Sequence, residues 1–536
     1  MKARQIYLPM IIAAAVVVGM FVGSRYNYPA RPNEESKQQK IRQIIDYIDY
    51  KYVVDVNTDS LLDLTIRDML HKLDPHSSYI SQRDVQAQEE SIQGSFDGVG
   101  IEFRVRKDTV TVIRVIPEGP AMRAGLKAGD RIIAIDDLSV IGDYETTAPL
   151  VETLRGPSGE EVYVEVMGRG ETLSRSIAIT RGPIPIHSVD VSYMLNDSVG
   201  LVKVNRFADN TMDEFNFAIR SLERQGMNTL ILDLRDNPGG LLESAKDMAD
   251  AFLSEGKTIV YTVDRDGEKH TSTATNRGIF EYGEVVVLVN ESSASASEVV
   301  AGALQDNDRA IIVGRRTFGK GLVQQEMSLN DGSRMRLTTS KYYTPTGRSI
   351  QKPYDNGYDA YQMDNIQRIE DGELFRPDSS KFDHDERFVT EGGKVVYGGG
   401  GIMPDIFVPI DSSIFTYGML YHQFGYSRLS DFAFDYVDSR RAEFGGVNRR
   451  DFIDSWNVPQ DLYLELLEKL DVLKYEERID DEMRAFIELR LKAVIAETVW
   501  GKDGYYPVVF QTDPVIKSAL LSVGAYSDTI PRPELP

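Results

Sequence analysis

A cluster of serines at residues 292–297 is the first group in the sequence whose types and spacing suggest chemistry. An apolar run typical of a strand precedes it and one typical of a helix follows, so Ser295 is expected at a strand-to-helix junction. Ser295 and Glu298 fit a Ser-x-x-Glu capping box, which by itself would explain both residues. The junction also suits a nucleophile, because the N–H of Ala296 and the positive end of the helix dipole would lie beside an oxyanion formed on the serine.

A nucleophilic serine needs a base, and lysine is the better candidate in this chain. The six histidines form no recognisable triad motif, and no Gly-x-Ser-x-Gly elbow occurs. Lys320 stands in the run 318–321, directly after an apolar strand. Its pKa must fall from about 10.4 towards neutrality before it can accept the serine proton, which requires desolvation. We expect apolar walls around it from Phe318, Leu322, Val323, Val299 and Val300.

The lysine segment is also a near-match for a phosphate-binding loop. Gly314, Gly319 and Lys320 reproduce Gly-x-x-x-x-Gly-Lys after a strand. However, Gly321 stands where a magnesium-binding Ser or Thr is required, and the residues after it alternate into a hairpin instead of opening a helix. These departures disfavour nucleotide binding.

A glycine-containing turn at residues 98–101 could bind a peptide. It consists of Gly98, Val99, Gly100 and Ile101, and the run Pro-Ala-x-x-Ala-Gly-Leu-x-x-Gly-Asp-x-Ile follows at residues 120–132. This pattern resembles a PDZ domain. The resemblance implies that backbone N–H groups of the turn bind a terminal carboxylate while the next strand pairs with the incoming peptide. The alternative is that these glycines are ordinary turn residues.

Taken together, the serine and lysine segments and the PDZ-like region resemble the carboxyl-terminal processing proteases. These tail-specific proteases of the S41 family are serine peptidases with a Ser–Lys dyad and an embedded PDZ domain. The resemblance covers about residues 40–410, and the matching runs are residues 73–75 with 77–79, 234–241, 293–298, 318–321, and 398–401 with 404–405.

The family resemblance assigns roles to individual residues. Ser295, the middle serine of Ser-Ala-Ser-Ala-Ser, would be the nucleophile, Lys320 the base, and Gln324 the residue that orients the lysine. The oxyanion hole would consist of the N–H groups of Ala296 and of the turn at Gly239 and Gly240. Arg155, in a turn motif shared with the family, could sense alignment of the PDZ domain; the alternative is a solvated surface arginine. The resemblance implies no metal and no organic cofactor.

The elements that must position these residues form a multidomain α/β chain. Strands at 199–204, 229–234, 258–263, 285–289 and 310–313 alternate with helices at 212–224, 241–253 and 298–304, which predicts a mostly parallel core sheet. The expected domains are a helical N-terminal region (25–93), a PDZ β domain (94–182), an α/β Ser–Lys protease core (183–410) with a polar surface excursion at 352–400, and a helical C-terminal region (411–536).

Length, charge and cysteine content limit the function classes. A chain of 536 residues is long enough for three or four domains. Its net charge of −23 makes nucleic acid a poor partner, because an acidic surface repels phosphates. The absence of cysteine excludes disulfides, thiolate zinc sites and a cysteine nucleophile.

The N-terminus predicts a membrane segment at residues 1–24. Lys2 and Arg4 precede a charge-free run from Gln5 to Ser24, longer than the ~7–15 apolar residues of a cleaved signal. We favour an uncleaved signal anchor over a cleavable signal. Positive charge on the short segment before the charge-free run keeps the N-terminus in the cytoplasm. The expected location is therefore the bacterial inner membrane, with the catalytic part in the periplasm or otherwise extracytoplasmic.

The function predicted from the sequence is that of a membrane-anchored serine endopeptidase. Its partners would be protein or peptide substrates with apolar C-termini, and the helical regions could form a homodimer. The rival hypothesis is a catalytically silent PDZ scaffold. Loss of Ser295 or Lys320 would have favoured the scaffold, and both residues are present.

Overall fold

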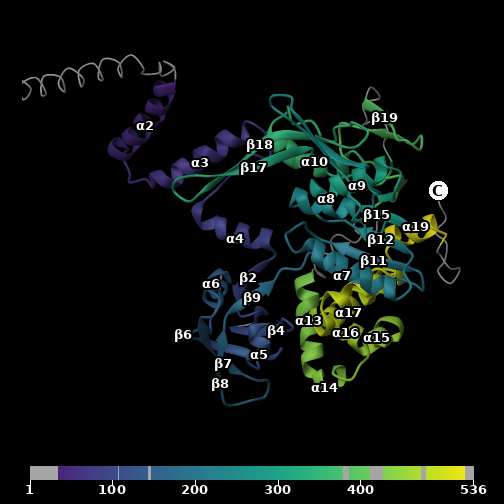
Figure 1. Cartoon of the computed structure of the whole chain (residues 1–536). Helices are drawn as coiled ribbons and strands as arrows, with labels where there is room; N and C mark the ends of the chain where they lie inside the picture. The colour runs from purple at the N-terminus through teal and green to yellow at the C-terminus, as the bar shows by residue number, and fades with distance from the viewer. Residues whose placement is uncertain are drawn as a thin grey trace, which may run out of the picture. The chain divides into compact units, whose positions relative to one another are not determined.

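The computed structural model describes residues 34–106, 108–142, 146–377, 386–410, 426–471 and 479–524 (Figure 1). Contacts divide the chain into two compact units, residues 1–73 and 74–536. The predicted anchor at residues 1–24 lies outside the described residues. Among the helices that are described, none combines the length and apolar character needed to cross a membrane.

The first unit contains the helices α2 (Glu34–Lys51) and α3 (Thr58–His71). Both carry the apolar spacing that the sequence shows, and an apolar groove of about 140 Å³ lies between them. The groove is lined mainly by isoleucine and leucine side chains: Ile41, Ile44, Ile45, Ile48, Leu61 and Leu62.

The β domain in the second unit follows strand β1 (Ser78–Ile80) and helix α4 (Gln82–Gln93). Its antiparallel sheet has the order β3-β4-β5-β7-β8, with β6 on β5, so β3 is an edge strand. The elements are β3 (Ile101–Arg106), β4 (Thr109–Val115), β5 (Arg131–Ile135), β6 (Leu138–Ser139), β7 (Glu161–Met167), β8 (Arg175–Thr180), α5 (Pro120–Arg123) and α6 (Ala148–Leu154). Strands β2 (Ser95–Gly98) and β9 (Gly182–Pro185) pair where the chain enters and leaves the domain.

The central sheet has the order β10-β11-β12-β15-β16-β21, and every pair except β10–β11 is parallel. This confirms the mostly parallel sheet that the sequence predicts. The strands are β10 (Val189–Met194), β11 (Val199–Val204), β12 (Thr229–Asp233), β15 (Glu284–Val289), β16 (Ile311–Gly314) and β21 (Ile406–Phe407).

Helices cover both faces of the central sheet (Figure 1). Side chains of a strand point alternately to its two faces, so β15 contributes Val285, Val287 and Val289 to one core, and Val286 and Leu288 to the other. The first core includes residues of α7 (Thr211–Arg224), α8 (Leu242–Asp250) and α9 (Ala296–Asp306). The second core packs against α19 (Pro514–Ser522).

Residues 258–263, predicted as part of the parallel sheet, belong to a second sheet instead. Strand β13 (Thr258–Asp264) pairs antiparallel with β14 (Lys269–Thr273) and with β18 (Arg334–Tyr343). β18 also pairs with β1 and with β17 (Leu322–Ser328). An apolar run predicts a strand, but its partners are set by long-range packing, which explains the error.

The segment predicted as a polar excursion also contains regular structure. It forms α10 (Tyr358–Glu370) and the hairpin β19 (Arg387–Val389) and β20 (Val395–Tyr397). Arg368 of α10 is buried and donates to the carbonyl oxygens of Arg316 and Thr317 at 2.7 and 3.2 Å. The segment therefore holds the backbone of the loop that leads to Lys320 through these hydrogen bonds.

The C-terminal region is helical, as predicted. It comprises α13 (Tyr426–Ser439), α14 (Arg441–Phe444), α15 (Arg449–Ser455), α16 (Gln460–Lys469), α17 (Asp481–Trp500), α18 (Lys502–Val509) and α19. Most of these helices share one apolar core. Ion pairs join α13 to the β domain, from Arg106 to Asp435 at 2.7 Å and from Arg169 to Asp438 at 3.0 Å.

Candidate active site

Three loops meet where neighbouring parallel strands of the central sheet end. The glycine loop (residues 235–241) follows β12, the serine loop (290–295) follows β15, and the lysine loop (315–321) follows β16. The carboxyl ends of parallel strands lie at one edge of a sheet, where binding sites of α/β folds usually form. A cavity of about 1000 Å³ lies there and is lined by residues of all three loops or their flanks, including Gly239, Ser295 and Lys320.

Ser295 is the serine of its cluster that faces this cavity. Ser293 and Ser297 are fully buried and donate to backbone carbonyls, to Leu234 at 2.8 Å and to Asn237 at 3.0 Å. Ser295 is half-buried, and its backbone has φ 55° and ψ −112°. A non-glycine residue rarely adopts such a conformation, and functional sites are where it occurs most.

Lys320 lines the same cavity, and its pKa is lower than that of an ordinary lysine. Burial and the positive charge of Arg336 lower its pKa to about 8, against the opposing carboxylates of Glu298 and Asp74. Among the described residues no hydrogen bond joins the Lys320 ammonium to Ser295. The two side chains thus share one cavity without a hydrogen bond between them in this conformation.

Glu298 connects the serine loop to the lysine loop. Its fully buried carboxylate accepts from the N–H of Ser295 at 2.8 Å, from Gly319 at 2.7 Å and from Lys320 at 2.9 Å. The Thr317 hydroxyl donates to it at 2.5 Å. Burial raises the pKa of Glu298, although these hydrogen bonds oppose the change. The residue predicted as a cap therefore also sets the spacing between Ser295 and Lys320.

The surroundings of Lys320 are more polar than the sequence suggested. Leu322, Val323 and Val299 line the cavity, but Phe318 and Val300 are not among its lining residues. Phe318 packs edge-on against Tyr361, and Val300 lies in the main core.

Asp74 and His76 are titratable groups that interact electrostatically with Lys320 and for which the sequence predicts no role. The charge of Lys320 helps burial to lower the pKa of His76 to about 3, so His76 is neutral, and its Nε2 lies 2.8 Å from the Tyr361 hydroxyl. Asp74 belongs to the family-like residues 73–75 and 77–79, but no role was predicted for it, and His76 lies between these residues without matching the family.

Gln324 lines the cavity but is not bonded to Lys320. Its amide donates to the Thr338 hydroxyl at 3.2 Å, and Thr338 donates in turn to Asp74 at 3.0 Å. A register shift between Val323 and Gln324 interrupts the pairing of β17 with β18 at this point. Orientation of the lysine by Gln324 stays a prediction.

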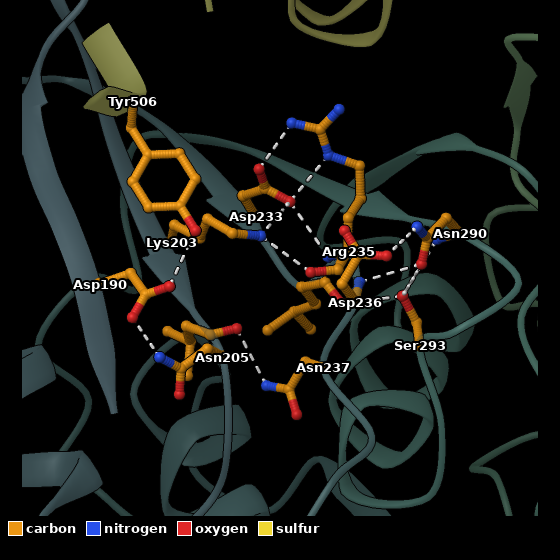
Figure 2. Close-up of polar contacts among 12 residues, drawn as sticks. Asp190, Lys203, Asn205, Asp233, Arg235, Asp236, Asn237, Asn290, Ser293 and Tyr506 are labelled. Atoms are coloured by element: carbon orange, nitrogen blue, oxygen red, sulfur yellow. Dashed lines mark hydrogen bonds and ion pairs between the residues drawn. The ribbon is translucent and has the colours of Figure 1, made fainter. Parts of the chain in front are cut away.

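The glycine loop lies against Ser295, and its polar contacts are drawn in Figure 2. A Cβ atom added to Gly239 would lie 2.9 Å from Cβ of Ser295, so only glycine fits there. The N–H of Gly239 donates to the side-chain oxygen of Asn237 at 2.9 Å. Among the described residues, the N–H groups of Gly240 and Ala296 have no acceptor, so of the predicted oxyanion donors these two are available to a ligand in this conformation.

The glycine and serine loops are held together by reciprocal bonds. The N–H of Asp236 donates to the Asn290 side chain at 3.0 Å, and Asn290 donates back to the Asp236 carboxylate at 2.8 Å (Figure 2). The N–H of Ala294 donates to the carbonyl of Asn237 at 3.0 Å. These contacts fix the distance between the glycine loop, which carries Gly240, and the serine loop, which leads to Ala296.

The predicted peptide-binding turn joins β2 to the edge strand β3. Gly98, Val99 and Gly100 are buried and Ile101 is half-buried. Gly100 has φ +79°, and a Cβ atom there would lie 2.8 Å from the Ile184 side chain, which explains the need for glycine. The free edge of β3 can pair with an extended peptide.

Arg155, the suggested sensor, is partly exposed and also has partners within the fold. It donates to Glu90 of α4 at 2.6 Å, and its guanidinium lies 4.3 Å from the centre of the Phe96 ring. Helix α4 also supplies Gln88, Ser91 and Ile92 to the cavity that contains Ser295. Arg155 therefore links the β domain to a helix that lines the cavity.

Comparisons with known proteins agree with this architecture. Residues 198–357 match peptidase family S41, residues 111–167 match the PDZ domain, and residues 423–501 match a family of unknown function. The carboxy-terminal-processing protease of Bartonella bacilliformis is 34% identical over 326 residues, which cover 60% of this chain and 74% of the relative. The chain belongs to the carboxy-terminal processing proteases of family S41.

Further relatives of the protease carry the same description. The carboxy-terminal processing protease CtpA of Bacillus subtilis is 34% identical over 319 residues, which cover 59% of this chain and 67% of the relative. Among solved structures, the photosystem II D1 C-terminal processing protease is 31% identical, covers 58% of this chain and 83% of that chain, and gives a TM-score of 0.34.

Family membership makes the chain a serine-type peptidase with a PDZ domain. The hypothesis of a catalytically silent scaffold is thereby set aside. A PDZ domain also indicates peptide binding, in agreement with the partner class predicted from the sequence.

Proposed function

We propose that the protease hydrolyses peptide bonds with Ser295 as nucleophile and Lys320 as general base, and that its PDZ domain recognises substrate C-termini. The observation that carries this proposal is the shared cavity of Ser295 and Lys320, in which burial lowers the pKa of the lysine to about 8. A lysine on the protein surface would be almost fully protonated at neutral pH and could not act as a base. A buried one keeps a useful neutral fraction.

The proposed reaction proceeds through an acyl-enzyme. The neutral amine of Lys320 takes the proton from Ser295 Oγ as Oγ bonds to the carbonyl carbon of the substrate. The N–H groups of Ala296 and Gly240 stabilise the oxyanion, and the N–H of Gly239 could join them if it left Asn237. The Lys320 ammonium then protonates the departing amine. A water molecule, deprotonated by Lys320, releases the acyl group and restores the serine.

Tail recognition is proposed for the turn at residues 98–101 and the edge of β3. Among the described residues, the N–H groups of Val99 and Gly100 have no acceptor, so they are available to a terminal carboxylate. Side chains of the same strand, such as Ile101 and Phe103, pack against the apolar core of the domain. A bound tail with apolar side chains would extend that core, which is why apolar C-termini are the proposed substrates.

The substitution Gly100→Asp is expected to reduce hydrolysis of an unfolded protein with an apolar tail by about tenfold, because φ +79° and the contact with Ile184 leave no room for a side chain. Labelling of Ser295 by a small fluorophosphonate should stay near the wild-type rate. Both rates are measured on purified variants.

Gly170→Asp is the matched control for this experiment. Gly170 has φ +74° in the same domain, but a Cβ atom there would meet nothing within 4 Å. Its variant should match the wild type in both assays. Equal losses in both assays for Gly100→Asp would mean that the PDZ domain also gates the dyad, as the link through Arg155 allows. Hydrolysis by Gly100→Asp at the wild-type rate would refute the proposal that the PDZ domain recognises substrate tails.

We also propose that residues 1–24 anchor the protease in the bacterial inner membrane, with the catalytic part in the periplasm. The support is the charge-free run after Lys2 and Arg4. The full-length chain should sediment with membranes, and the chain without residues 1–24 should remain in the supernatant. Fractionation with N-terminal sequencing measures this, and an intact N-terminus in the soluble fraction would contradict it. The predicted homodimer stays a prediction, and the apolar groove between α2 and α3 supports it.

A further inference from the structure

A buried ion cluster stands at the start of the glycine loop. Arg235 donates to both oxygens of the Asp233 carboxylate, at 2.9 and 2.7 Å, and Asp233 is fully buried at the end of β12 (Figure 2). Lys203 of β11 donates to the carbonyl of Arg235 at 2.8 Å and lies 3.8 Å from Asp233. The cluster therefore holds both the side chain and the backbone of Arg235.

The fourth charge of this cluster comes from the C-terminal helices, 278 residues further along the chain. Asp513, the N-cap of α19, accepts from Arg235 at 2.7 Å. Burial alone would lower the pKa of Arg235, but Asp233 and Asp513 outweigh it and raise the pKa. Two cations and two carboxylates thus balance in a site that is nearly closed to water.

A second contact joins the C-terminal helices to the wall of the cavity. Tyr506 of α18 donates to the Asp190 carboxylate at 2.9 Å, and Lys502 and Asn205 donate to the other oxygen of Asp190 (Figure 2 labels Asp190, Asn205 and Tyr506). Asp190, Asn205 and Lys502 all line the cavity that contains Ser295. The C-terminal helices therefore contribute to the wall of the proposed catalytic cavity.

From these contacts we infer that the C-terminal helices α18 and α19 are part of the catalytic apparatus, because Asp513 holds Arg235 and thereby the glycine loop against Ser295. The inference rests on the proposed function, since it concerns the oxyanion donors of the Ser295 reaction. Asp513 and Arg235 are positioning residues.

Attachment of α19 does not by itself require Asp513. Val515, Ile516, Ala519 and Leu520 already pack this helix onto the central sheet. A buried ion pair adds little net stability over such packing, but loss of one partner leaves an uncompensated charge. Without the Asp513 carboxylate, Lys203 and Arg235 face the single carboxylate of Asp233. Arg235 would then move towards water and displace the backbone that leads to Gly240.

The test is Asp513→Asn in the full chain, with Asp513→Ser as a second variant. Asparagine and serine both cap helices, so α19 keeps its N-cap while the anion is lost. We expect kcat on a tailed protein and the rate of Ser295 labelling by a fluorophosphonate to fall about tenfold, because small displacements of a catalytic group cost this much or more. KM should change little, and both variants should remain folded at the assay temperature, although the uncompensated charge lowers their thermal unfolding temperature.

Asp503→Asn is the matched control, because within the described part of the chain the exposed Asp503 carboxylate of α18 pairs with Arg449 alone, at 3.2 Å. It should match the wild type in every assay. Wild-type kcat and labelling in Asp513→Asn would overturn the inference, and so would unfolding of both Asp513 variants, since Asp513 would then stabilise the fold as a whole. Activity that survives Ser295→Ala would instead refute the proposed function.

Discussion

Ser295→Ala is expected to reduce peptide hydrolysis by on the order of 10⁶-fold, since removal of a serine nucleophile leaves only binding and oxyanion stabilisation. Lys320→Ala should cause a comparable loss, because no other described side chain in the cavity combines a buried amine with a lowered pKa. Hydrolysis of an unfolded protein with an apolar tail measures the effect, and circular dichroism and thermal unfolding check the fold. Full activity of Ser295→Ala would refute the assignment of the nucleophile.

Lys320→Arg separates base chemistry from simple positive charge. A guanidinium stays protonated throughout the working pH range, so it can hold a cation in the cavity but cannot accept the serine proton. The variant should therefore be as inactive as Lys320→Ala. Substantial activity in Lys320→Arg would mean that the lysine acts only through its charge.

Ser293→Ala and Ser297→Ala are the matched controls for the nucleophile. Each serine donates one buried hydrogen bond to a backbone carbonyl, so its loss should lower the free energy of unfolding by about 1–3 kcal/mol. Neither hydroxyl lines the cavity, and both variants should keep substantial activity. Peptide mapping after fluorophosphonate treatment identifies the labelled serine. Label on Ser293 or Ser297 would contradict the assignment of Ser295 as the nucleophile.

The sequence predicts the catalytic pair because its signals are local. Ser295 and Lys320 each follow an apolar strand, and β15 and β16 are neighbours in a parallel sheet, so their loops meet at one edge. The Gly239–Gly240 turn follows β12, the strand on the other side of β15. Short motifs and the family resemblance therefore assigned the three loops to one site, and the strand order in the structure explains why they meet.

Contacts between residues far apart in the sequence could not be predicted in the same way. Asp74 and His76 reach Lys320 because β1 pairs with β18 in the register Ser78 to Arg336, and no pattern in either strand specifies that partner. The bond from Arg235 to Asp513 spans 278 residues. The N–H of Gly239 is occupied by the Asn237 side chain, whose amide in turn donates to the carbonyl of Val204, 33 residues earlier in the chain.

The rate of hydrolysis is expected to rise steeply with pH up to about pH 8, because only neutral Lys320 is a base and its pKa is about 8. With that pKa, the neutral fraction and hence kcat/KM should increase about 50-fold between pH 6 and pH 8 and level off above pH 9. His76 interacts electrostatically with Lys320 but has a pKa of about 3. It therefore stays neutral over this range and adds no second transition to the pH–activity profile. An acid limb with its midpoint near 6.5 would instead indicate a histidine base.

The charged groups around Lys320 determine the pH at which this rise in activity has its midpoint. Burial and Arg336 lower the pKa of the lysine, whereas Glu298 and Asp74 raise it. Arg336→Met removes one of the lowering contributions and also leaves Glu326, which lines the same cavity, without its cationic partner at 2.6 Å, so that Arg334 at 3.5 Å is its remaining ion pair among the described residues. Both changes favour the ammonium form, so the limb should move to higher pH and activity at pH 7 should fall. Arg336→Lys retains the charge and should leave the midpoint nearly unchanged, and a downward shift in Arg336→Met would show that Lys320 is not the group being titrated.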